Sequence, residues 1–211
     1  SRTAAGWSRK NQAEELKEKL VNALISTDCF RLGEFTLKSG KKSPFYIDLR
    51  RLISDPGALA LAGKAYATLA KECEFDRLAG IPAAALPLAT AAGLELNAPM
   101  IWPRMPVKDH GTGNKVEGAF KRGEKALLLD DLITTGLSKR EAVEILRSEG
   151  LVVEDLVVLV ERGKAGRSDM EGLGIRLRAF LHIREIVATL ERLGHIDSTT
   201  REKLERYVEE E

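Results

Sequence analysis

Short runs of apolar residues alternate with segments of helical periodicity, and this alternation restricts the fold more than any other feature of the sequence. The runs lie at 77–81, 126–129 and 156–160, and carboxylates or turn residues bound them. Continuous apolar runs of this length are typical of parallel strands covered on both faces. Strands that alternate with helices indicate an α/β fold with right-handed crossovers. We therefore predict a mainly parallel central sheet flanked by helices.

The remaining elements follow from periodicity, caps and turns. Residues 104–123 are polar, contain four glycines and show no clean period, which predicts a loop of about 20 residues. Loops of this length usually have a functional reason. The other predicted strands are 35–37, 45–47 and 99–102, and the predicted helices are 11–25, 54–73, 86–96, one that ends at Gly150, 183–193 and 199–208.

Length and composition indicate one ordinary domain. The chain has 211 residues, which suits a single domain spanning 11–211 after a frayed segment at 1–10. It begins without Met, so we expect a processed product or a piece excised from a larger bifunctional chain.

Charge and cysteine usage exclude several classes of function. Lys plus Arg number 33 against 32 for Asp plus Glu, a balance that argues against a dedicated nucleic-acid binder. No apolar run approaches the roughly 20 residues that span a bilayer. Cys29 and Cys73 have no metal-site spacing and are expected to be reduced thiols in a cytoplasmic protein.

The stretch 127–138 carries the strongest chemical signal. It reads as an apolar strand that ends in Asp130 and Asp131, followed by a Thr-Thr-Gly turn that opens a helix. Ligands of open α/β sheets bind at the carboxyl ends of strands, and helix N-termini bind anions. Two acids beside a phosphate cradle make sense if the ligand also presents hydroxyls or a hydrated magnesium ion. The alternative is a solvated acidic turn before an N-capped helix.

This stretch resembles the phosphoribosyl pyrophosphate (PRPP) binding motif of type I phosphoribosyltransferases. Two further stretches sharpen the resemblance to the orotate phosphoribosyltransferase family. The first is Phe-Thr-Leu-Lys-Ser-Gly at 35–40 followed by Ser-Pro-Phe-Tyr-Ile-Asp at 43–48, which is similar to the N-terminal signature of the family. The second is Lys-Asp-His-Gly-Thr-Gly at 108–113 followed by Val-Glu-Gly at 116–118, which is similar to its mobile catalytic loop. The resemblance covers about 30–211.

The resemblance implies a fold, a reaction and partners. The fold would be that of type I phosphoribosyltransferases, with a small hood formed largely by the N-terminal region and with the mobile loop. The reaction would convert orotate and PRPP to orotidine 5′-monophosphate and pyrophosphate, with Mg²⁺ held mainly through PRPP and water and not directly by protein ligands. The loop would reach into the neighbouring subunit of a homodimer, and an orotidylate decarboxylase would be fused or associated.

The resemblance also implies a role for each matching residue. Lys108, His110 and Arg104 would act on the departing pyrophosphate, and Asp130 and Asp131 would face the ribose hydroxyls, directly or through water. The implied catalytic residues are Lys108, His110, Arg104 and Asp131; those for PRPP are Lys38, Asp130, Asp131, Thr134, Thr135, Gly136 and Ser138; and those for orotate are Tyr46 and Arg162.

The sequence departs from the family pattern in the loop. Met105 stands where the family usually has its first loop lysine, and Pro106 stiffens the segment. Lys115, Lys121 or Arg122 could replace the missing charge. The turn at 83–85, three alanines, also lacks a lysine that many members carry. These changes leave open a catalytically weakened PRPP- or nucleotide-binding regulatory relative, and a phosphoribosyltransferase for another base.

Overall fold

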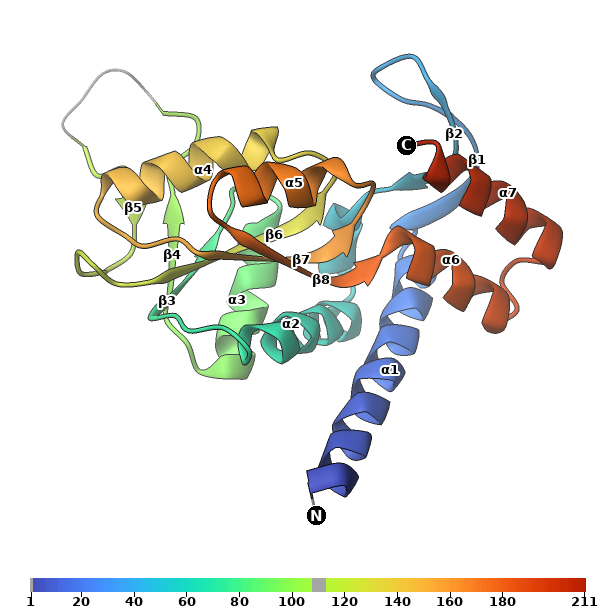
Figure 1. Ribbon diagram of the computed structural model, residues 1–211, viewed down its shortest axis with the longest axis horizontal. Helices are drawn as coiled ribbons and strands as arrows, with labels where there is room; N and C mark the ends of the chain where they lie inside the picture. Colours follow the sequence, from blue (N-terminus) through green and yellow to red (C-terminus); the bar gives the residue numbers. More distant parts are fainter. Residues whose placement is uncertain (1, 108–112) are drawn as a thin grey trace. The chain divides into compact units, whose positions relative to one another are not determined.

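The computed structural model describes residues 2–107 and 113–211, with side chains from Gly6 onward except that of Trp7. The chain divides into two compact units (Figure 1), one formed by Ser1–Leu61 with Leu181–Glu211 and one by Ala62–Phe180. None of the helices in the described residues is long and apolar enough to cross a bilayer.

The second unit is built on a six-stranded sheet. Strands β3, β4, β6 and β7 run parallel, and the short β5 pairs antiparallel with β4. The spatial order is β5-β4-β3-β6-β7-β8. The bounds are β3 (Arg77–Gly80), β4 (Met100–Pro103), β5 (Val116–Glu117), β6 (Ala126–Ile133), β7 (Asp155–Glu161) and β8 (Arg176–His182).

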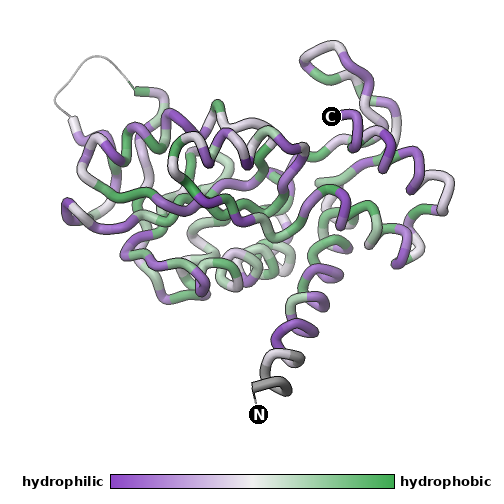
Figure 2. The backbone as a smooth tube through the Cα atoms, viewed as in Figure 1, coloured by the Kyte–Doolittle hydropathy of each residue, from purple (hydrophilic) through white to green (hydrophobic). Residues whose placement is uncertain are grey.

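Helices cover both faces of this sheet (Figure 1). Helix α3 (Ala85–Leu96) and the part of α2 (Pro56–Ala70) beyond Leu61 lie on one face, and α4 (Leu137–Ser148) and α5 (Ala165–Gly172) lie on the other. All seven residues of β7 are buried, and apolar residues follow the strands through the centre of the unit (Figure 2). The continuous apolar runs of the sequence are thus explained by burial on both faces.

The sheet has a switch point between β3 and β6. From β3 the chain continues through α3 to β4 on one side, whereas β6 pairs with the opposite edge of β3 and continues through α4 to β7. Connections leave in opposite directions from these two strands, so a crevice opens at their carboxyl ends, where open α/β sheets bind ligands. Asp130 and Asp131 lie at that end of β6.

The first unit contains a hairpin and three helices. Strands β1 (Phe30–Thr36) and β2 (Lys42–Ile47) pair antiparallel around a turn in which Gly40 has φ +81°, a conformation that favours glycine. Phe45 stacks on Phe30 and meets Tyr207 edge to face, with centroids 5.4 and 5.6 Å apart. The other elements are α1 (Arg2–Ser26), the 3₁₀ helix η1 (Leu49–Ser54), α6 (Ile183–Arg192) and α7 (Ser198–Glu209).

Most predicted elements are present, and the differences are of several kinds. Strand β1 begins at Phe30, before the expected 35–37, and η1 was not expected. Helix α1 begins at Arg2 and so includes residues expected to be frayed. Strand β5 interrupts the expected loop of 104–123. Helix α5 and strand β8 are missing from the predicted elements: α5 is short and mostly polar, and β8 carries Arg176 and Arg178 among its apolar residues.

Candidate functional site

The acid pair is held in place by the backbone. The Asp131 N–H donates to Asp130 Oδ1, and the Leu132 N–H donates to Asp131 Oδ1, both at 2.8 Å. From α2, the Tyr66 hydroxyl donates to the Asp130 carbonyl oxygen at 2.7 Å. Asp130 is buried and Asp131 is half-buried, so the second acid is the more accessible of the two.

Burial and mutual repulsion alter the acid–base behaviour of this pair. Loss of solvation, and then the neighbouring Asp130 carboxylate, raise the pKa of Asp131 to about 7. Burial and the same two carboxylates raise the pKa of Tyr66 well above its ordinary value, so its hydroxyl remains a neutral donor. Asp131 therefore changes its charge near neutral pH, where an acceptor for ribose hydroxyls would be needed.

A buried lysine completes the acid pair, and the sequence analysis missed it. Lys139 Nζ lies 2.8 Å from Asp130 Oδ2 and also donates to the Leu132 carbonyl oxygen at 2.9 Å and to Ser138 Oγ at 3.1 Å. A signal was present, because Lys139 lies three and four residues before Ala142 and Val143 on the apolar face of α4.

The turn between β6 and α4 has the form of an anion site, with one donor already engaged. The side chains of Thr134, Thr135 and Ser138 are exposed at the start of the helix. The Gly136 N–H, however, donates to the Asp169 carboxylate of α5 at 2.7 Å. Helix α5 approaches so closely that a Cβ on Gly136 would lie 2.4 Å from Asp169 Cβ, so only glycine fits there. In this structure the Gly136 amide is therefore not free for a phosphate.

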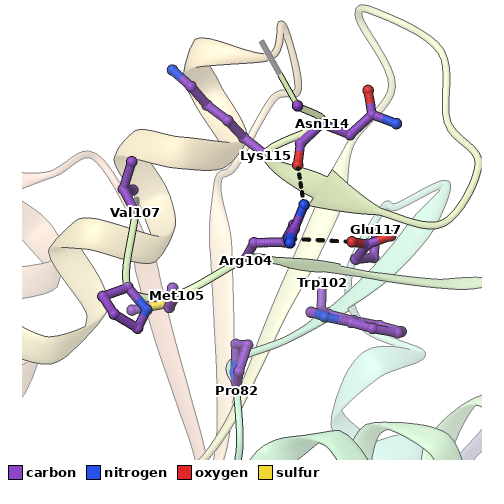
Figure 3. Close-up of a pocket in the computed structure, with 10 residues that line it drawn as sticks. Pro82, Trp102, Arg104, Met105, Val107, Asn114, Lys115 and Glu117 are labelled. Carbon is purple, nitrogen blue, oxygen red and sulfur yellow. Dashed lines mark hydrogen bonds and ion pairs between the residues drawn. The ribbon is translucent and has the colours of Figure 1, made fainter. Parts of the chain in front are cut away.

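A cavity of about 430 Å³ lies at the carboxyl end of β3 and β4 (Figure 3). The Arg104 Nε lies 3.3 Å from Glu117 Oε1, and its Nη1 donates to the Asn114 carbonyl oxygen at 3.4 Å. Lys115 lines the same cavity, whereas Lys121 and Arg122 are not among the described residues that line it. The cavity is lined by Pro82, Trp102, Arg104, Met105, Pro106, Val107, Gly113, Asn114, Lys115 and Glu117.

Met105 makes an apolar contact with the core of the unit. It is partly buried and packs against the hydrophobic cluster of the sheet and α4. Two residues on, the Val107 N–H donates to Glu141 of α4 at 3.4 Å. The start of the loop is thus fastened to the sheet and to α4. Lys108 and His110, the two loop residues implied to act on pyrophosphate, lie outside the described residues.

The two residues implied for orotate lie in different units. Arg162 follows β7, is 9% exposed, and its N–H donates to the Ile133 carbonyl oxygen at 2.8 Å, so it lies at the same sheet edge as the acid pair. Tyr46 belongs to β2, where its ring lies 5.7 Å from Phe35 and the Arg31 guanidinium lies 5.1 Å above it. Lys38 is exposed in the hairpin turn.

The donor set suits a hydrated magnesium ion better than a directly ligated one. The described residues contain no group of three or more His, Cys, Asp and Glu side chains that could hold a metal. Asp130 is paired with Lys139, which leaves Asp131 as an acceptor for metal-bound water or for hydroxyls. Mg²⁺ usually keeps several waters and binds through one or two carboxylates plus substrate phosphates.

Comparisons with known proteins identify the family. The chain is 36% identical over 173 residues to orotate phosphoribosyltransferase of Pyrococcus furiosus, which covers 81% of this chain and 95% of that protein. Its structure is similar to that of Leishmania donovani UMP synthase, with a TM-score of 0.82 and 38% identity over 92% of this chain and 42% of that one. A Mycobacterium tuberculosis orotate phosphoribosyltransferase solved with PRPP has a TM-score of 0.65 and 25% identity, covering 81% and 98%.

No family model matches the sequence. The chain spans about two-fifths of the length of the first curated relatives that it matches, 37% of one and 42% of the other. Similarity over nearly the full length of the Pyrococcus enzyme nevertheless shows that the chain, with its α/β fold of the type I phosphoribosyltransferases, belongs to the orotate phosphoribosyltransferase family.

Proposed function

We propose that this chain transfers the 5-phosphoribosyl group of PRPP to orotate and releases pyrophosphate. One observation carries the proposal: two acids near the end of β6, at the switch point of the sheet, are followed two residues later by a Thr-Thr-Gly turn at the N-terminus of α4. The acids can accept hydrogen bonds from a diol, and the turn can donate hydrogen bonds to a phosphate. A ligand that carries a diol and a phosphate close together therefore matches this site. The family relationship, and the Mycobacterium relative solved with PRPP, support the same ligand.

The chemistry asks for positioning and charge stabilisation. Bond breaking at the ribose anomeric carbon develops positive charge on the sugar and negative charge on pyrophosphate. The Asp131 carboxylate would accept from the ribose hydroxyls, the turn would hold the 5′-phosphate, and Arg104 and Lys115 would meet the leaving group. Arg162 would offer its guanidinium fork to the carboxylate of orotate. A bound Mg²⁺, held through PRPP and water, would supply further positive charge to the pyrophosphate.

The proposal extends to assembly and location. We propose a homodimer in which the part of the loop that carries Lys108 and His110 serves the partner's site. We also propose an orotidylate decarboxylase that is fused or associated. Bifunctional relatives longer than this chain support the second point. We place the reaction in the cytoplasm, because Cys29 and Cys73 are both free thiols.

The direct test is turnover. Purified protein is mixed with PRPP, Mg²⁺ and orotate, uracil or hypoxanthine, and loss of base absorbance and release of pyrophosphate are followed. Of the three bases, we expect only orotate to give pyrophosphate release. We expect the Asp131→Asn variant to lose this activity. PRPP binding by calorimetry without turnover on any base would instead identify a regulatory relative. Turnover on another base would correct the substrate.

A further inference from the structure

Lys139 is the one buried lysine among the described residues, and it contacts three parts of the site. Only 5% of its surface is exposed. Its ammonium group pairs with Asp130 Oδ2, donates to the carbonyl oxygen of Leu132 in β6, and donates to Ser138 Oγ in the first turn of α4. A single cation therefore joins the acid pair, the strand and the phosphate turn.

The two acids differ in their hydrogen-bond partners and in their exposure to solvent. Both oxygens of Asp130 have partners, Lys139 at Oδ2 and the Asp131 N–H at Oδ1, and the residue is only 6% exposed. Asp131 is more exposed. The geometry thus holds Asp130 firmly in place and leaves Asp131 as the more accessible of the two acids.

The positive charge of Lys139 also reduces the electrostatic cost of placing two adjacent carboxylates where solvent exposure is low. The charged and titratable groups around Asp131 are Asp130 on its own strand, Lys139 from α4 and Tyr66 from α2. Asp130 favours the protonated form of Asp131, and Lys139 favours the ionised form. Without the lysine, both carboxylates would repel each other with no cation within contact.

We propose that Lys139 is a positioning residue for the phosphoribosyl transfer, which holds Asp130 and the phosphate turn in place beside Asp131, the more accessible acceptor for the ribose. This inference rests on the proposed function. Through Ser138, the same lysine sets the position of the phosphate turn relative to the acids.

The test compares Lys139→Met with Arg140→Met. The control removes an exposed positive charge from the next residue of α4 and leaves Asp130 paired. Two quantities are measured: the pH dependence of kcat/KM for PRPP, and the titration of the Asp131 carboxyl by ¹³C NMR of aspartate-labelled protein.

In Lys139→Met we expect the Asp131 titration and the rising limb of the pH profile to move up by about one pH unit. We expect KM for PRPP to rise by about tenfold, with kcat changed by less than about threefold. Arg140→Met should alter neither. A folded Lys139→Met with an unmoved Asp131 titration, or with lower kcat/KM and an unmoved pH profile, overturns the proposal.

A second pair of variants covers the case in which Lys139→Met does not fold. Asp130→Asn and the double variant Asp130→Asn/Lys139→Met differ only in the lysine, and neither buries an unpaired carboxylate at position 130. The proposal requires Asp131 to titrate at higher pH in the double variant, and equal titrations contradict it. Because NMR needs no turnover, absent activity in the wild-type protein would reject the proposed function and still leave Lys139 tested.

Discussion

At the scale of a single residue, Asp131 combines a position suited to ligand binding with burial that is unfavourable for its charge. Its position at the end of β6 suits a ligand with hydroxyl groups, whereas its burial beside Asp130 disfavours its charge. Natural sites keep such a residue when its role outweighs the loss of stability. Because the pKa of Asp131 is raised, both the free energy of unfolding and the activity should depend on pH in a measurable way.

We predict that Asp131→Asn stabilises the ligand-free protein, and does so most at high pH. The folded-state pKa of about 7 lies above the ordinary value of 3.8, so the folded state binds the proton more tightly than the unfolded state does. The free energy of unfolding of the wild type therefore falls as pH rises from about 4 through about 7. Above pH 7 the variant should gain about 1–3 kcal/mol, or roughly 3–10 °C in Tm, and near pH 4 almost nothing. Thermal unfolding followed by circular dichroism across this range checks it; a gain independent of pH would assign the effect to packing.

Asp169 leads to a second prediction at this scale. Its carboxylate accepts from the Gly136 N–H at the helix N-terminus where a phosphate would bind, so its negative charge opposes that phosphate. Asp169→Asn keeps an acceptor and removes the charge, and we expect binding of PRPP to tighten by about two- to fivefold. Calorimetry at low salt measures the change. Glu171→Gln, an exposed acid on the same helix, should leave the affinity unaltered, and weaker binding by Asp169→Asn would show that its carboxylate supports the turn instead.

At the scale of elements, β4 and β5 shape a cavity that combines an apolar anchor with cations. Met105 packs against the core beneath it, while Arg104 and Lys115 provide positive charge at its wall (Figure 3). The residue that departs from the family pattern thus fixes the start of the loop. Lys115, on the segment that leads into β5, is placed to supply the charge that Met105 lacks.

We therefore expect Lys115→Ala to lower kcat/KM for PRPP by about ten- to a hundredfold, because a charge-assisted contact to the leaving group is lost. The matched control is Lys121→Ala, an exposed lysine of the same segment outside the cavity lining. Steady-state kinetics with pyrophosphate detection compares the two. Equal effects of both substitutions would mean that general positive charge, and not the place of Lys115, is responsible.

At the scale of the whole molecule, the implied site residues are divided between two compact units. Lys38 and Tyr46 belong to the unit of the hairpin, and the acid pair, the phosphate turn and Arg162 belong to the unit of the sheet. The proposed homodimer adds a further division, since the loop would complete the site of the partner.

Mixing two inactive variants tests this division. Asp131→Asn damages the acid pair and Lys108→Ala damages the loop, so each homodimer should be inactive. When the subunits are exchanged in equal amounts, half the dimers are mixed and one of their two sites carries neither change. We expect recovery of about a quarter of wild-type activity. No recovery, despite exchange verified by differently tagged subunits, would place each site within one chain.

The sequence by itself determined the order of elements and the motif at their centre. Apolar runs marked β3, β6 and β7, because a strand buried on both faces must be apolar throughout. The motif could be predicted from the sequence, because the order of residues along the chain is enough to place Asp130 and Asp131 at a strand end. The same order places the hydroxyl groups of Thr134 and Thr135 at the start of a helix. Where apolar periodicity failed, as in α5 and β8, prediction failed too.

Only the tertiary structure decided which partners these residues meet. Lys139 is near Asp130 because α4 folds back onto β6, and Asp169 reaches Gly136 across 33 residues because α5 packs against the turn. Burial of the acid pair raises the pKa of Asp131, an effect that depends on the surrounding helices and strands and has no signature in the local sequence. Contacts between distant segments determine the charge and the accessibility of the site residues. Patterns local to the chain determine only the helices and strands on which these residues lie.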